Sequence, residues 1–256
     1  MATVDPASLA LAAAMAAAAG LIGCFAVMRR MTLAADALSH VALPGIGVAL
    51  LLKFHPAIGA SAALFLGTLL VWSLEKRTRV STEAIIGVVF SAALALGSLL
   101  SSGEELIEAL LGRPGTLSRG EAVLGLLAAA AVIVFVLRAK DRLVVALVSP
   151  DIARTAGIDA GRLDLLYLMA FALTVALGLR YLGALLMGSL VIIPAVAAKR
   201  LASGLSGMLA AAVGIAVFST LTGTLLAARI GRETGPLIIL VAAACFALSL
   251  LRPRPS

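Results

Sequence analysis

The chain has 256 residues, of which 62% are hydrophobic, 13% charged and 4% aromatic. A soluble domain is roughly 45–50% apolar and one quarter charged, and a disordered chain needs low hydrophobicity, so the composition excludes both classes. The net charge of +7 comes from basic residues scattered between apolar runs, a pattern that argues against nucleic-acid binding. We therefore expect an all-α protein that spans a lipid bilayer several times.

Nine apolar segments are long enough to be considered as membrane spans, because a bilayer core of about 30 Å needs about 20 helical residues. They cover residues 8–28, 37–52, 56–74, 84–102, 122–137, 164–180, 182–198, 206–228 and 235–251. The second segment is short and the break between the sixth and seventh is narrow, so eight spans is the alternative count. We expect one transmembrane domain over residues 1–256, with a cytoplasmic loop at about 138–163.

The distribution of positive charge predicts the direction of the chain. If the N-terminus faces outward and nine segments alternate, 14 of the 20 Lys and Arg residues lie in internal loops and 6 lie outside. We therefore expect an external N-terminus and a cytoplasmic C-terminus. The first segment is expected to be a retained span, because its arginines follow the apolar run whereas a signal peptide has its positive charge in front.

The motifs of several enzyme classes are missing from the sequence. There is no G-x-x-x-x-G-K-[ST] loop for nucleotide phosphates, no H-E-x-x-H zinc motif, and no pair of intramembrane aspartates for a protease. The chain is therefore expected to be a pathway rather than an enzyme, with no intrinsic cofactor and with energy supplied from elsewhere.

One ionisable pair stands out in the apolar segments. Asp36 and His40 are four residues apart, which places both on one face of a helix. A charged group at membrane depth costs several kcal/mol, so such a pair suggests a function, and a carboxylate with an imidazole suits zinc, manganese or ferrous iron. Pro44 and Gly45 follow and are expected to loosen the helix and free backbone carbonyls.

Two points limit this metal hypothesis. The alternative is that Asp36 caps the helix start near the inner face, two turns after Arg29 and Arg30, while His40 is hydrogen-bonded to a neighbour. A divalent metal also needs about four ligands, and one chain offers two. A homodimer with its two-fold axis through the pathway would supply two aspartates and two histidines.

A short helix is predicted inside the 138–163 loop. Ser149 is a typical N-cap, Pro150 a typical first helical residue, Asp151 suits the first turn, and Gly157 is a typical stop. By these local signals alone it is a surface helix of about two turns in a connecting loop.

Several single residues are assigned to packing or to loops. Cys24 and Cys245 lie in apolar runs and are expected to be small buried hydrophobes, His55 a loop histidine, and Trp72 an anchor at the membrane interface. The acidic outer loop contains Glu104, Glu105 and Glu108 and suits either solvent or a partner protein. Pairs of small residues are spaced for close helix contact: Gly20 and Gly23, Ala184 and Gly188, and Gly204 and Gly207.

Four stretches resemble the membrane permeases of zinc, manganese and iron ABC importers, in the same order over nearly the whole chain. The first runs from Arg29-Arg30-Met31 through Asp36-Ala-Leu-Ser-His40 to Pro44-Gly45-Ile-Gly47. The others are Glu75-Lys76-Arg77, Gly183 to Ala198 with its central Pro194, and Thr234-Gly235-Pro236. The scarcity of histidine, with His40 and His55 alone, leaves the metal open.

The resemblance implies a role for each predicted site. Asp36 and His40 would coordinate the transported metal at a gate, with Pro44, Gly45 and Pro194 shaping the gate or its hinges. The 149–157 helix would dock on a separate ATPase, with Ala153, Ala156 and Gly157 allowing close approach and Arg154 pairing with an acidic groove. Implied partners are two ATPase copies, a second copy of the chain and an external binding protein, in a bacterial cytoplasmic membrane.

Two other functions are also compatible with the sequence. A related ABC permease for a siderophore or cobalamin would share the overall plan without needing the Asp36–His40 pair. A membrane scaffold or an intramembrane enzyme is the alternative outside transport, although paired catalytic groups are missing for the enzyme.

Overall fold

The computed structural model describes residues 6–31, 34–78, 80–100, 119–181 and 184–251, and the regular elements in these ranges are helices. In chain order they are α1 (Pro6–Met28), α2 (Ala34–Leu51), α3 (Pro56–Arg77), α4 (Thr82–Leu100), α6 (Arg119–Val148), α7 (Pro150–Thr155), α8 (Ala160–Tyr181), α9 (Ala184–Leu201), α10 (Leu205–Ile230) and α11 (Thr234–Leu250). The predicted all-α fold is confirmed for this part of the chain.

Each of the nine predicted segments overlaps one of these helices. Within the described ranges, six helices are long and apolar enough to cross a membrane, namely α1, α3, α4, α6, α8 and α10. Two further apolar stretches, Asp36–Leu51 of α2 and Thr234–Leu250, are shorter. The number of spans and their direction stay predictions.

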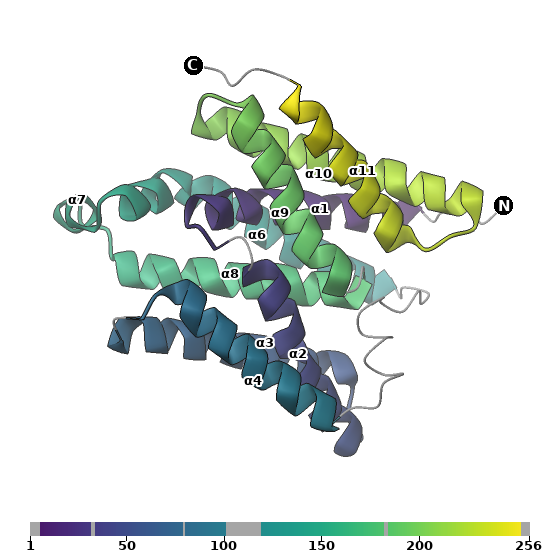
Figure 1. The fold of residues 1–256 in the computed structure, drawn as a ribbon, viewed down its shortest axis with the longest axis horizontal. Helices are drawn as coiled ribbons and strands as arrows, with labels where there is room; N and C mark the ends of the chain where they lie inside the picture. The colour runs from purple at the N-terminus through teal and green to yellow at the C-terminus, as the bar shows by residue number, and fades with distance from the viewer. Residues whose placement is uncertain (1–5, 32–33, 79, 101–118, 182–183, 252–256) are drawn as a thin grey trace.

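The helices form three packed groups (Figure 1). Helices α1, α6 and α8 lie in the middle, α9, α10 and α11 pack along one side of them, and α2, α3 and α4 along the other. The two outer groups meet where α2 packs against α9, and α3 packs against α8 of the middle group. Helix α7 protrudes at one end of the molecule, between α6 and α8 (Figure 1).

Glycines allow the helix backbones to approach one another closely. A Cβ added to Gly23 of α1 would lie 1.9 Å from the carbonyl oxygen of Val191 in α9, and one added to Gly20 would lie 2.9 Å from that of Ala212 in α10. Between α2 and α3, Gly45 and Gly59 face each other, since a Cβ on either would lie 2.1 Å from the other's carbonyl oxygen. Lipid tails are as apolar as the helices, so such close packing is what holds them together.

Helix α6 is longer than the sequence pattern suggested. The sequence predicts a loop that begins at about residue 138, whereas α6 continues to Val148. The reason is a stripe at helical spacing, Val132, Val136, Ala139 and Leu143, all of which are buried. The basic residues of this stretch therefore lie on a continuing helix, and the connection to α8 consists mainly of α7 and its flanking turns.

Other single residues have specific local roles. Cys24 is buried, as expected, whereas Cys245 is half-buried. His55 is an exposed N-cap of α3, and its Nδ1 accepts a hydrogen bond from the Ala57 N–H at 3.3 Å. Gly204 precedes α10 with open space around it, so the packing role expected for this residue is wrong. Glu104, Glu105 and Glu108 lie outside the described residues.

The α2–α3 contact predicts a stability difference between two glycine variants. We expect Gly59→Ala to lower the free energy of unfolding by about 1–3 kcal/mol, the usual cost of overpacking, because the added Cβ meets backbone that has no freedom to rotate away. Gly87→Ala in α4 is the control, since nothing lies within 4 Å of its added Cβ. Denaturant unfolding in detergent measures both variants, and equal stability would contradict the packing described here.

Candidate metal site on helix α2

Asp36 lies in the first turn of α2 and is exposed in the single chain. Its backbone rests against Gly188 of α9, since a Cβ added to Gly188 would lie 3.1 Å from both Cα and Oδ1 of Asp36. The absence of a side chain at Gly188 therefore lets α9 approach α2 beside the carboxylate. The predicted small-residue contact at Gly188 is thus a contact with the candidate site.

His40 lies one turn further along α2 and is half-buried. Its ring packs against Phe90 of α4, with centroids 5.5 Å apart and the planes tilted by 59°. The Nδ1 atom is buried and has no hydrogen-bond partner in the described part of the chain. A buried polar atom without a partner is costly. The alternative prediction, in which His40 is hydrogen-bonded to a neighbouring residue, is therefore not supported at Nδ1.

The positions of Phe90 and Gly188 along their own helices show how far the pair lies from the helix ends. Phe90 lies eight residues after Thr82 at the start of α4, and Gly188 lies eleven residues before Lys199 near the end of α9. At 1.5 Å per residue these offsets correspond to about 12 Å and about 16 Å along the two helices. His40 therefore lies beside the middle of α4, and Asp36 lies beside the first third of α9, although Arg29 at the end of α1 precedes Asp36 by two turns in sequence.

The predicted gate residues are found in α2 and α9. Helix α2 continues through Pro44, and because proline has no N–H, the carbonyl of His40 lacks its ordinary i+4 helical bond. Gly45 is packed against α3 at Gly59. Pro194 is buried within α9, six residues after Gly188. Their roles as gates or hinges stay predictions.

A single chain supplies an incomplete ligand set. Within the described residues, no group of three or more His, Cys, Asp and Glu side chains gathers where it could hold a metal. Asp36 and His40 therefore represent two donors on one helix face, with the exposed carboxylate available to a further partner.

The predicted helix in the 138–163 loop is confirmed as α7. The Ser149 hydroxyl caps it by accepting a hydrogen bond from the Ile152 N–H at 3.3 Å, Pro150 occupies the first turn, and Gly157 follows the helix with φ of 70°. Asp151 lies in the first turn and forms an exposed ion pair with Arg154 at 3.8 Å.

One residue of this helix differs from expectation. Ala153 is fully buried against its own chain, so its side chain is unavailable for contact with another protein. The exposed face of α7 instead includes Ile152, which is 61% exposed, together with Arg154 and Ala156.

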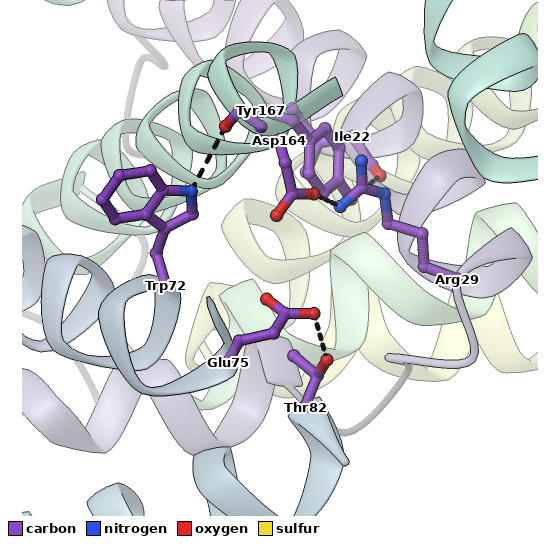
Figure 2. A network of polar contacts seen from close by, with 8 residues as sticks. Ile22, Arg29, Trp72, Glu75, Thr82, Asp164 and Tyr167 are labelled. Atoms are coloured by element: carbon purple, nitrogen blue, oxygen red, sulfur yellow. Dashed lines mark hydrogen bonds and ion pairs between the residues drawn. The ribbon is translucent and has the colours of Figure 1, made fainter. Parts of the chain in front are cut away.

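Polar contacts at the start of α8 are absent from the sequence predictions. Asp164 forms an ion pair with Arg29, whose guanidinium lies 4.5 Å above the ring centroid of Tyr167 (Figure 2). The Tyr167 hydroxyl donates to the carbonyl of Ile22 at 3.1 Å. We call Arg29, Trp72, Gly161, Asp164 and Tyr167 the α8 contact cluster.

Trp72 belongs to this cluster rather than acting only as an interface anchor. Its indole N–H donates to the Gly161 carbonyl at 3.3 Å, and the Lys76 ammonium lies 4.1 Å from its ring centroid. The sequence did contain a signal for the cluster, because Asp164 stands at the edge of a predicted span with Tyr167 one turn later.

Comparison with known proteins gives the chain a family. The model of the ABC 3 transport family matches residues 3–252. The chain belongs to this family. The resemblance noted from the four sequence stretches is therefore confirmed.

Individual relatives match most of the chain. The high-affinity zinc uptake system membrane protein ZnuB of Haemophilus influenzae is 29% identical over 240 residues, which cover 90% of each chain. The manganese transport system membrane protein MntC of Halalkalibacterium halodurans is 29% identical over 90% of this chain and 80% of its own. The structure of PsaBC from Streptococcus pneumoniae in complex with Fab has a similar fold, with a TM-score of 0.81 at 23% identity over 95% of this chain and 90% of that one.

The Gly188 contact predicts that a larger residue at this position of α9 would displace Asp36. We expect Gly188→Val to weaken zinc or manganese binding to the purified complex by about tenfold, equivalent to about 1.4 kcal/mol, because the added side chain displaces the Asp36 backbone. Gly214→Val in α10 is the matched control, since its added Cβ meets nothing within 4 Å. Equilibrium dialysis measures both, and equal affinities would show that α9 does not position Asp36.

Proposed function

We propose that the chain is the permease subunit of an ATP-driven importer of divalent transition-metal ions. The observation that carries this proposal is the Asp36–His40 pair in a chain of the ABC 3 transport family. Within the described residues the buried Nδ1 of His40 has no partner, and the ring lies beside the middle of α4. An ionisable pair at that depth is costly unless it serves the passage of a polar substrate.

The proposed substrate class is zinc, manganese or ferrous iron. A carboxylate and an imidazole suit all three ions, whereas soft thiolate donors, which would favour copper(I), are not part of the pair. Two relatives of equal identity carry zinc and manganese in their names, so the proposal is made for the class and not for one ion.

The proposed working unit is a homodimer. One chain offers two donors where a metal needs about four, and a two-fold axis through the pathway would bring the same two residues from the second copy. The exposure of Asp36 in the single chain supports this arrangement, because the carboxylate would be reachable from the partner. One metal bound per two chains is the stoichiometry that the proposal requires.

The remaining partners follow from the proposed import cycle. An external binding protein delivers the metal, Asp36 and His40 replace part of its hydration shell, and two ATPase subunits drive the opening toward the cytosol through α7. The proposed topology has nine spans, an external N-terminus and a cytoplasmic C-terminus in a bacterial cytoplasmic membrane. The chain itself performs no hydrolysis in this scheme.

The metal site is tested by uptake with two histidine variants. In cells that also produce the neighbouring ATPase and binding protein, His40→Ala should lower uptake of labelled zinc or manganese by about tenfold or more, because loss of one good ligand interaction of ~1.4 kcal/mol already gives that factor. His55→Ala is the control, since His55 is an exposed N-cap of α3. Uptake unchanged in His40→Ala would discard the site, and uptake of a metal chelate instead would favour the siderophore or cobalamin alternative.

The docking role of α7 is tested at its exposed apolar residue. Ile152→Glu should abolish most of the stimulated ATP hydrolysis, because it places a charge on the face proposed to contact the ATPase, where desolvating an unpaired carboxylate is costly. Ile230→Glu is the matched control, as Ile230 is 55% exposed at the far end of α10. Co-purification of the ATPase and phosphate release measure both variants, and unchanged hydrolysis in Ile152→Glu would reject α7 as the docking element.

A further inference from the structure

Helix α7 and the start of α8 are joined by a hydrogen-bonded turn. The Ile158 N–H donates to the Ala153 carbonyl at 2.9 Å and the Gly157 N–H to the Arg154 carbonyl at 3.1 Å, which closes the turn after α7. Asp159 then caps α8 by accepting from the Arg162 N–H at 3.0 Å. The connection between α7 and α8 is therefore short and internally bonded, and α7 packs against both α6 and α8.

The first turns of α8 are attached to two other helices by directional polar contacts. Asp164 is paired with Arg29 at the end of α1, and the two side chains are only 22% and 13% exposed, so water screens the pair weakly. Gly161 accepts the Trp72 N–H from α3 (Figure 2). Both contacts resist sliding in a way that apolar packing does not, because their strength depends on angle and distance.

Each attached helix has a connection to the helix that carries the metal pair. For α1 the connection is the chain itself, because α1 is followed by α2. Helix α3 packs on α2 through Gly67, five residues before Trp72, since a Cβ added to Gly67 would lie 2.6 Å from a methyl of Val41, the neighbour of His40. A hydrogen bond from Thr82 to Glu75 also ties the start of α4, whose Phe90 touches His40, to the end of α3.

We propose that Arg29, Trp72 and Asp164 are positioning residues that transmit the displacement of α7 to Asp36 and His40 on α2. This inference rests on the proposed transport function and deepens it. One branch runs from Asp164 through Arg29 and α1, and the other from Gly161 through Trp72 and α3. The cluster thereby converts movement at the ATPase end of the molecule into a change at the metal site.

A purely structural role for the cluster makes a different prediction. If the contacts only hold the bundle together, weakening them lowers the amount of assembled complex, and metal uptake and ATP hydrolysis fall in proportion. If they transmit movement, the assembled complex hydrolyses ATP but moves less metal for each ATP. The ratio of metal imported to phosphate released therefore separates the two roles.

The experiment uses the full transporter, with its ATPase and binding protein, in liposomes supplied with zinc or manganese ions. Asp164→Asn removes the charge of the ion pair at nearly constant shape, and Trp72→Phe removes the indole N–H while keeping an aromatic ring. Arg162→Gln is the matched control, because Arg162 pairs with Asp159 in the same turn and its side chain is 86% exposed. We expect the two cluster variants to lower the uptake-to-hydrolysis ratio about fivefold to a hundredfold, the range typical of coupling between two sites, and Arg162→Gln to keep it.

Two results would overturn the inference. One is a wild-type ratio in both Asp164→Asn and Trp72→Phe, and the other is a parallel fall of uptake and hydrolysis in both. If Asp164→Asn fails to assemble, Trp72→Phe alone decides, since it leaves the ion pair intact. A wild-type complex that imports neither metal contradicts the proposed function instead, and the inference is then tested by whether stimulation of ATP hydrolysis by the binding protein survives in the same variants.

Discussion

Close approach of backbones around α2 is the constraint on which the rest of the structure depends. Glycines from three neighbouring helices face α2 along its length: Gly188 of α9 at Asp36, Gly67 of α3 at Val41, Gly97 of α4 at Leu43, and Gly59 of α3 at Gly45. Each lacks the Cβ that would collide with α2. A helix that carries an ionisable pair is therefore held by its backbone on several sides, and the pair itself need not contribute to packing.

The middle group of helices is held by a second kind of contact. Around α8 an ion pair, an indole hydrogen bond and a tyrosine hydroxyl join α1, α3 and α8 at the end where α7 lies. Polar contacts of this kind are expensive to break in an apolar environment because the separated groups find few other partners. The molecule thus combines tight, undirected packing around Asp36 and His40 with directional contacts near α7, and α3 belongs to both regions.

The sequence predicted those features that depend on local spacing. Nine apolar runs predicted the positions of nine of the described helices, and the Ser149, Pro150 and Gly157 signals predicted α7 with its cap and stop. Capping and span length involve residues a few positions apart, so one sequence suffices for them. The candidate pair was also found by spacing, as Asp36 and His40 are separated by one helical turn.

Features that depend on which helices meet could not be predicted from the sequence. Arg29 is near Asp36 in sequence and suggests that the pair lies close to the inner face, whereas Phe90 lies near the middle of α4 and Gly188 in the first third of α9. Ala153 is predicted to face an external partner, because a small residue on a short helix suits close approach to either side. The ion pair of Asp164 could not be predicted, since its partner Arg29 lies 135 positions away.

The position of Asp36 at the start of α2 constrains how a metal could be released. Asp36 lies in the first turn of α2, where the backbone N–H groups carry partial positive charge. That positive end opposes a cation that would leave past it along the helix axis. Release on that side would therefore require α2 to move relative to α9 at Gly188, and in the proposed permease the movement of α7 would have to reach α2 itself.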